Sequence, residues 1–124
     1  MKKHVVMVIE DSPELSASLE DMLAMNGHTP IIAPNGREGV KQALKTHPDL
    51  ILLDIRLPDI DGYEVFRQIR RDSWGKTAHI VILTASESIE NISKNVSLPP
   101  EDVLFKPNWS IKKLAEYINK KLAS

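Results

Sequence analysis

Residues 50–62 read LILLDIRLPDIDG and carry the clearest structural signal in the chain. The four apolar residues Leu50–Leu53 do not alternate with polar ones, which is typical of a strand covered on both faces in a parallel sheet. Asp54 follows directly, so we expect its carboxylate at the carboxyl end of that strand, where ligand chemistry gathers in open α/β sheets. Pro58 and Gly62 bracket the turn that follows.

The same pattern of an apolar strand followed by an amphipathic helix occurs five times. Strands are predicted at residues 5–9, 29–33, 50–53, 80–83 and 103–105. The helices between and after them are predicted to open at polar caps, which are Ser12, Asn35, Asp61, Ser86 and Asn108. Pro30 cannot donate to a sheet ladder, which places the second strand at an edge. Strict alternation predicts an α/β fold with a parallel sheet and right-handed crossovers.

The bulk composition predicts one domain that spans residues 1–124 and excludes several function classes. With 16 basic and 17 acidic side chains, the chain has a net charge of -1, so we expect no direct binding to nucleic acid or to an anionic membrane. It has no cysteine, which excludes disulfides and thiolate metal sites. No stretch approaches the length of a membrane span, so we expect a cytoplasmic protein.

Polar side chains follow four of the predicted strands. They are Glu10, Asp11, Asp54, Thr84 and Lys106. Parallel strands bring their carboxyl ends to one edge of the sheet, so we expect these groups to converge. Carboxylates this close repel each other by roughly 4 kcal/mol per pair at about 4 Å and an effective dielectric constant near 20. A hard divalent cation with oxygen ligands offsets this repulsion, and few carboxylates with several waters suit Mg²⁺.

Such a site suits phosphoryl transfer onto a carboxylate. Asp54 is the candidate nucleophile, since carboxylates form acyl-phosphate intermediates. Mg²⁺ is expected to bridge Asp54, Asp11 and a phosphoryl oxygen, while Thr84 and Lys106 hydrogen-bond the other phosphoryl oxygens. Asp59 and Asp61 are expected to be loop and cap residues. The side chain of Arg56 is expected either near the phosphoryl entrance or in solvent.

These residues resemble the response-regulator receiver domains of bacterial two-component signalling, and the resemblance covers the whole chain. The matching motifs are Glu10-Asp11, Asp54, Pro58 with Gly62, Thr84-Ala85 and Lys106-Pro107. The resemblance implies a doubly wound, flavodoxin-like sheet of five strands in the order 2-1-3-4-5, flanked by five helices. It also implies a cis peptide bond between Lys106 and Pro107.

The same resemblance implies the function. Asp54 would accept a phosphoryl group from a sensor histidine kinase or a phosphotransfer protein, and the domain would signal rather than act as an enzyme. The metal ligands would be Asp11, Asp54 and the main-chain carbonyl of Arg56, with Glu10 acting through water. Downstream, the resemblance implies a protein partner, or an output domain that this chain does not include. It implies a monomer or a phosphorylation-dependent dimer.

Two other functions compete with this interpretation. Phosphohydrolases of the haloacid-dehalogenase type also use an aspartyl phosphate, but they place it on the first strand with a second Asp two residues later, where this chain has Arg56. The other alternative is a receiver-like module that binds partners without being phosphorylated. It is motivated by Val103, which stands where receivers usually carry a switch aromatic, and by the proline-containing segment at 96–100.

Overall fold

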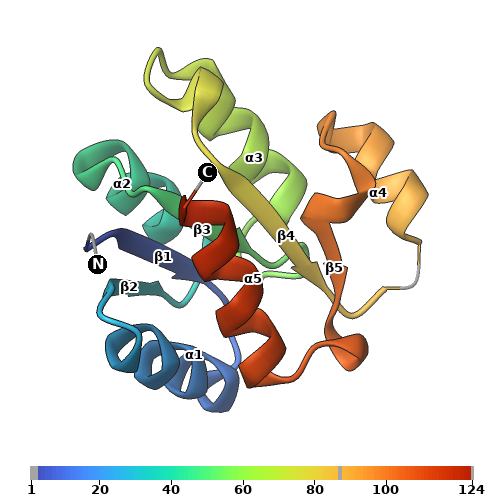
Figure 1. The fold of residues 1–124 in the computed structure, drawn as a ribbon. Helices are drawn as coiled ribbons and strands as arrows, with labels where there is room; N and C mark the ends of the chain where they lie inside the picture. Colours follow the sequence, from blue (N-terminus) through green and yellow to red (C-terminus); the bar gives the residue numbers. More distant parts are fainter. Residues whose placement is uncertain (1–2, 87, 124) are drawn as a thin grey trace.

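The computed structural model describes residues 3–86 and 88–123 and contains one parallel sheet. Its strands lie in the order β2-β1-β3-β4-β5, and each neighbouring pair is parallel (Figure 1). Their bounds are Val5–Ile9 (β1), Thr29–Ala33 (β2), Leu50–Leu53 (β3), Ile80–Thr84 (β4) and Val103–Phe105 (β5). The predicted α/β class and strand order are therefore confirmed, and Pro30 lies in an edge strand as expected.

In the described part of the chain, five α-helices connect or follow these strands. They are Pro13–Met25 (α1), Gly36–Thr46 (α2), Gly62–Arg71 (α3), Ile89–Val96 (α4) and Ile111–Ala123 (α5). Three short 3₁₀ turns lie at Gly75–Thr77 (η1), Pro100–Asp102 (η2) and Lys106–Asn108 (η3). Within residues 3–86 and 88–123, every helix is too short or too polar to cross a lipid bilayer.

Three of the five predicted helix caps are confirmed. The side chains of Ser12, Asn35 and Asp61 each accept a hydrogen bond from the main-chain N–H three residues later. The predicted cap Ser86 is wrong, because α4 begins after Ser88. The predicted cap Asn108 is also wrong: it ends η3, and the Ser110 hydroxyl accepts the Lys113 N–H at 3.1 Å instead. Both helices start two residues later than expected.

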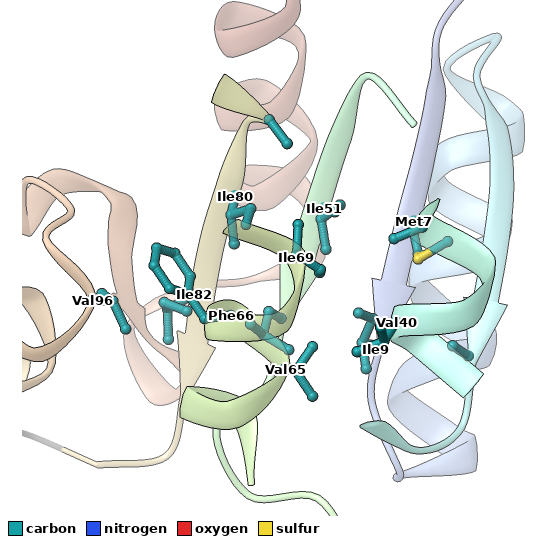
Figure 2. Close-up of a cluster of buried hydrophobic side chains, with 14 of the residues drawn as sticks. Met7, Ile9, Val40, Ile51, Val65, Phe66, Ile69, Ile80, Ile82 and Val96 are labelled. Carbon is teal, nitrogen blue, oxygen red and sulfur yellow. The ribbon is translucent and has the colours of Figure 1, made fainter. Parts of the chain in front are cut away.

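The sheet separates two hydrophobic cores. Helices α2, α3 and α4 cover one face, and α1 and α5 cover the other (Figure 1). Figure 2 shows the first core, in which Met7, Ile9 and Ile51 from the strands meet Val65, Phe66 and Ile69 from α3. The alternate strand residues, including Val6, Val8 and Leu52, belong to the second core. Burial on both faces explains why these strands are apolar at every position.

Candidate functional site

Asp54 lies directly after the carboxyl end of β3, between a buried strand and the start of α3. Its exposed fraction is 6%. The Arg56 N–H donates to Asp54 Oδ1 at 3.2 Å and orients the carboxylate. A Cβ on Gly62 would lie 2.4 Å from the Asp54 carbonyl oxygen, so only glycine lets α3 begin this close to the site.

Two further carboxylates lie beside Asp54. Oxygen atoms of Glu10, Asp11 and Asp54 all lie within 4.8 Å of one another, although Glu10 and Asp11 follow β1 and Asp54 follows β3. Glu10 is buried, and its Oε2 accepts the Ser12 N–H at 3.1 Å, which holds it against the start of α1. Asp11 is exposed, so the cluster is open to solvent on its side. The predicted convergence of these acids is therefore observed.

Lys106 brings a positive charge into this cluster. Its Nζ lies 2.7 Å from Glu10 Oε1 and 3.3 Å from Asp54 Oδ2. Burial raises the pKa of Glu10, and the charge of Asp54 adds to this effect, although Lys106 and the Ser12 N–H oppose it. Burial alone would lower the pKa of Lys106, but the two carboxylates outweigh burial and raise it. Lys106 therefore stays protonated at neutral pH.

The peptide bond between Lys106 and Pro107 is trans, because no peptide bond in the described part of the chain is cis. The expectation of a cis bond is thus wrong. Residues 106–108 instead form the 3₁₀ turn η3, and the ammonium group of Lys106 still reaches both carboxylates from there.

Thr84 ends β4 and is buried at the same edge of the sheet. Leu53 of β3 pairs with Ile82 of β4. If the same register continues past the end of β3, Leu83 lies beside Asp54, and Thr84 lies one residue further along. Its Oγ1 accepts the Ser86 N–H at 3.0 Å, so the hydroxyl is oriented by the loop that follows β4. The role of Ser86 is therefore to orient Thr84 through its main chain, which capping patterns in the sequence did not indicate.

Arg56 and Val103 occupy different surroundings. The main-chain N–H of Arg56 donates to the Asp54 carboxylate, while its side chain is exposed, which is compatible with both expected positions. Val103 is buried in the core under α4 and is 4% exposed. Phe105, two residues later, is half-buried at the end of β5.

The donor set fits a hard divalent cation. Three carboxylates against one ammonium leave an excess of two negative charges (3 − 1 = 2) in a partly buried site. All three acids offer oxygen, which Mg²⁺ prefers, and exposed Asp11 leaves room for water ligands. Glu10, Asp11 and Asp54 are therefore able to hold Mg²⁺ together.

Asp59 has a contact that its predicted role as a loop residue does not include. Its carboxylate accepts the N–H groups of Gly36 at 2.8 Å and Arg37 at 2.9 Å, at the start of α2. Partial burial alone would raise the pKa of Asp59, but these N–H groups lower it to about 2. The loop that follows Asp54 is thereby fastened to α2.

Comparison with known proteins identifies the family. The family model of the response regulator receiver domain matches residues 6–119. The chain belongs to this family. Receiver domains are the signalling domains of response regulators in two-component systems, and the chain is therefore one of them. The resemblance to receiver domains that the sequence motifs indicated is confirmed.

Two regulators of known name are similar to the chain in sequence. The chain is 35% identical over 102 residues to the transcriptional regulatory protein AfsQ1 of Streptomyces coelicolor and 33% identical over 102 residues to the response regulator MprA of Mycolicibacterium vanbaalenii. These matches cover 82% of the chain but only 44% of AfsQ1 and 43% of MprA, so the chain spans less than half the length of either regulator.

A receiver domain from a Pseudomonas aeruginosa sensor histidine kinase, PA1611, is similar over its full length. It was solved with a magnesium ion coordinated in its active-site cleft. The TM-score is 0.85 at 28% identity, and the match covers 99% of this chain and 100% of that one. The chemotaxis protein CheY4 of Vibrio cholerae matches with a TM-score of 0.84 at 23% identity, over 96% of this chain and 98% of that chain, and shows the shared fold.

Proposed function

We propose that this receiver domain accepts a phosphoryl group on Asp54 from a histidine kinase or a phosphotransfer protein in a Mg²⁺-dependent reaction. The observation that carries the proposal is the cluster itself. Asp54 lies beside two further carboxylates and within 3.3 Å of the Lys106 ammonium. Family membership supports it, since receivers are signalling domains of two-component systems.

The proposed step is a displacement at phosphorus. A carboxylate oxygen of Asp54 forms a bond to phosphorus as the bond between phosphorus and the donor imidazole nitrogen breaks. The donor imidazole leaves with the electron pair of that bond and takes a proton from solvent water. Lys106 donates to one phosphoryl oxygen and offsets its charge. The Thr84 hydroxyl donates a hydrogen bond to another phosphoryl oxygen, and the Ser86 N–H orients this hydroxyl.

In the proposal Mg²⁺ is held by Asp11, Asp54 and the carbonyl of Arg56, with Glu10 acting through water. When bound, the ion offsets charge on the phosphoryl oxygens and on the carboxylates. Before transfer, Lys106 keeps the Glu10 and Asp54 carboxylates close together, which lowers the repulsion that the ion has to overcome.

Phosphorylation is proposed to act by shifting the domain between two conformations that bind a downstream partner differently. The partner is a protein or an output domain outside this chain, with residues 1–124 acting as one domain that is a monomer or a phosphorylation-dependent dimer. The proposal places the reaction in the cytoplasm, the compartment expected from the sequence.

Mass spectrometry after incubation with acetyl phosphate and MgCl₂ tests the proposal. We expect one added phosphoryl group on the wild-type chain and on Asp61→Asn, a control in the same loop whose cap Asn preserves. Asp54→Asn should not be labelled, and EDTA should abolish labelling. Equal labelling of Asp54→Asn and the wild type contradicts the assignment of Asp54. Failure of all variants to be labelled, by acetyl phosphate and by phosphorylated histidine kinases alike, favours the module that only binds partners.

A further inference from the structure

A groove between α3 and α4 lies outside the carboxylate site. It has a volume of about 370 Å³. Besides Phe66 at its base, it is lined by Arg67, Arg70 and Arg71 of α3 and by Asn95, Val96 and Ser97 at the end of α4. We refer to these seven residues as the arginine groove. It adjoins the carboxyl-terminal half of α3, whereas Asp54 adjoins the first residue of that helix.

The base of the arginine groove is apolar. Phe66 and Val96 are 7% and 2% exposed and belong to the same core cluster, and Figure 2 shows Val96 on the α4 side of Phe66 and Ile82. The Arg70 guanidinium lies over the Phe66 ring, with Cζ 4.7 Å from its centroid. Because that ring face is covered, the groove offers no platform on which a nucleobase could stack.

The α3 wall of the groove has an excess of positive charge. Arg67 Nε lies 3.0 Å from Glu64 Oε1, and Arg71 Nη1 lies 3.9 Å from Glu64 Oε2, so the two arginines share one carboxylate. Arg70 donates to two neutral carbonyl oxygens, those of Gly75 and Ala78. Three guanidinium groups against this one carboxylate leave two excess positive charges (3 − 1 = 2), counting ion pairs among the described residues.

Two of these arginines are accessible to a partner. The side chains of Arg67 and Arg71 are 54% and 69% exposed. A guanidinium group binds a carboxylate through two parallel hydrogen bonds, and an exposed ion pair such as those of Glu64 is worth only about 0–1 kcal/mol. Carboxylates of a partner can therefore take the place of Glu64 at small cost. An apolar side chain between them would contact the base of the groove.

We propose that the arginine groove binds an acidic segment of a partner protein, in which Asp or Glu residues flank an apolar residue. A nucleic acid fits less well, because the chain has a net charge of -1 and the groove lacks an aromatic face for bases. The inference goes beyond the proposed phosphoacceptor function and does not depend on it.

Fluorescence anisotropy with a fluorescein-labelled peptide, EELEEL, tests the proposal on the full chain at low salt. We expect the double variant Arg67→Ala/Arg71→Ala to bind about tenfold more weakly than the wild type. The control Lys112→Ala/Lys113→Ala removes two exposed charges from α5 instead and should bind within about twofold of the wild type. Arg70 stays unchanged because it bonds to the loop after α3, and thermal unfolding checks that both variants fold.

Four unlabelled competitors and one further variant decide the outcome. The unlabelled neutral peptide QQLQQL should not displace the probe, and inorganic phosphate or a short DNA duplex should displace it only at higher concentration than unlabelled EELEEL. Equal loss of binding in both double variants, or stronger competition by phosphate or DNA, overturns the proposal. Asp54→Asn should bind the probe as the wild type does, so failure of the phosphoacceptor function and failure of the groove are measured separately.

Discussion

Lys106 holds two buried or nearly buried carboxylates together, and its removal should leave them repelling each other. We predict that Lys106→Met lowers the free energy of unfolding by about 1–3 kcal/mol without Mg²⁺. The expected loss is smaller than for a fully buried ion pair, because the Lys106 side chain is partly exposed. Because a divalent cation can replace the lost ammonium, MgCl₂ should recover most of this loss. Urea unfolding with and without MgCl₂ measures both effects.

The matched control for this experiment is Lys112→Met, which removes a charge from the exposed side of α5. Its free energy of unfolding should stay within about 0.5 kcal/mol of the wild type. Equal losses in the two variants, or no recovery with MgCl₂, would show that Lys106 does not offset the charge of Glu10 and Asp54.

Asp59 caps α2 from a distance, so its effect on stability should depend on pH. We predict that Asp59→Ala costs about 1 kcal/mol of unfolding free energy near neutral pH, as other losses of a helix cap do. The pKa of Asp59 in the folded chain is about 2, below the ordinary value of 3.8. The stabilisation is therefore fully present above about pH 4 and is lost as the pH falls through about 2.

Denaturant unfolding of both proteins between pH 7 and pH 2.5 measures this difference. The gap between wild type and Asp59→Ala should be constant down to about pH 4 and then narrow. A gap that widens toward low pH would contradict a stabilising contact between the Asp59 carboxylate and the N–H groups at the start of α2. Asp61→Ala, which removes a local cap on α3, is a useful comparison because both residues lie in one loop.

Single residues of the site were predictable where the signal is local, and less so where the partner is distant. Glu10, Asp54 and Lys106 stand at strand ends, and the sheet brings them together by its own geometry. Asp59 lies in the loop before α3, and its partners lie 22 and 23 residues away in the sequence, at the start of α2. Spacing rules describe neighbours along one element, so they do not report such a contact.

At the scale of an element, α3 depends on Gly62 because its first turn lies against the backbone of Asp54. A Cβ at Gly62 would lie 2.4 Å from Asp54 O and 2.6 Å from Ile55 Cα, and backbone atoms cannot move aside cheaply. We predict that Gly62→Ala destabilises the protein by about 2–4 kcal/mol and slows labelling by acetyl phosphate. Thermal unfolding and mass spectrometry measure the two effects.

Gly36 provides the comparison. A Cβ there would lie 2.6 Å from Ile60 Cγ1 and 2.8 Å from Val65 Cγ2, which are side-chain atoms that can shift. Gly36→Ala should therefore cost less stability than Gly62→Ala and leave labelling nearly unchanged. The reverse order would mean that the start of α3 tolerates displacement, and that the position of Asp54 does not depend on Gly62.

Helix starts were harder to predict than the helices themselves. The apolar stripes of α4 and α5 are buried as their spacing indicates, for example Ile92 with Val96 and Leu114 with Ile118. Each of these two helices is preceded by two polar residues that suit a cap, Ser86 with Ser88 and Asn108 with Ser110. The choice depends on where the loop leaves the strand and on the turn η3, which are tertiary features.

At the scale of the whole molecule, a cation that binds only the folded chain should stabilise it. At a Mg²⁺ concentration ten times the dissociation constant, we predict about 1.4 kcal/mol of added stability and a rise of about 4–6 °C in Tm. NaCl at the same ionic strength should not reproduce the rise, and Asp11→Asn should reduce it. Differential scanning calorimetry measures these shifts, and EDTA should reverse them. Equal rises with MgCl₂ and NaCl would exclude a specific site.

The overall arrangement was predictable because five segments repeat one pattern, but the pattern alone did not supply the strand order. An apolar strand followed by an amphipathic helix indicates a parallel sheet, and Pro30 indicates one of its edges. The order of the other four strands was expected from resemblance to receivers, because contacts that lie far apart in sequence decide it.

The two edge strands of the sheet, β2 and β5, affect how the protein aggregates at high concentration. Pro30 removes a donor from β2, and β5 has only three residues between the turns η2 and η3. Neither edge strand presents the long row of free amide and carbonyl groups on which cross-β fibrils grow. The folded chain should therefore resist amyloid-like aggregation, and its helices offer the larger surfaces for recognition by other macromolecules.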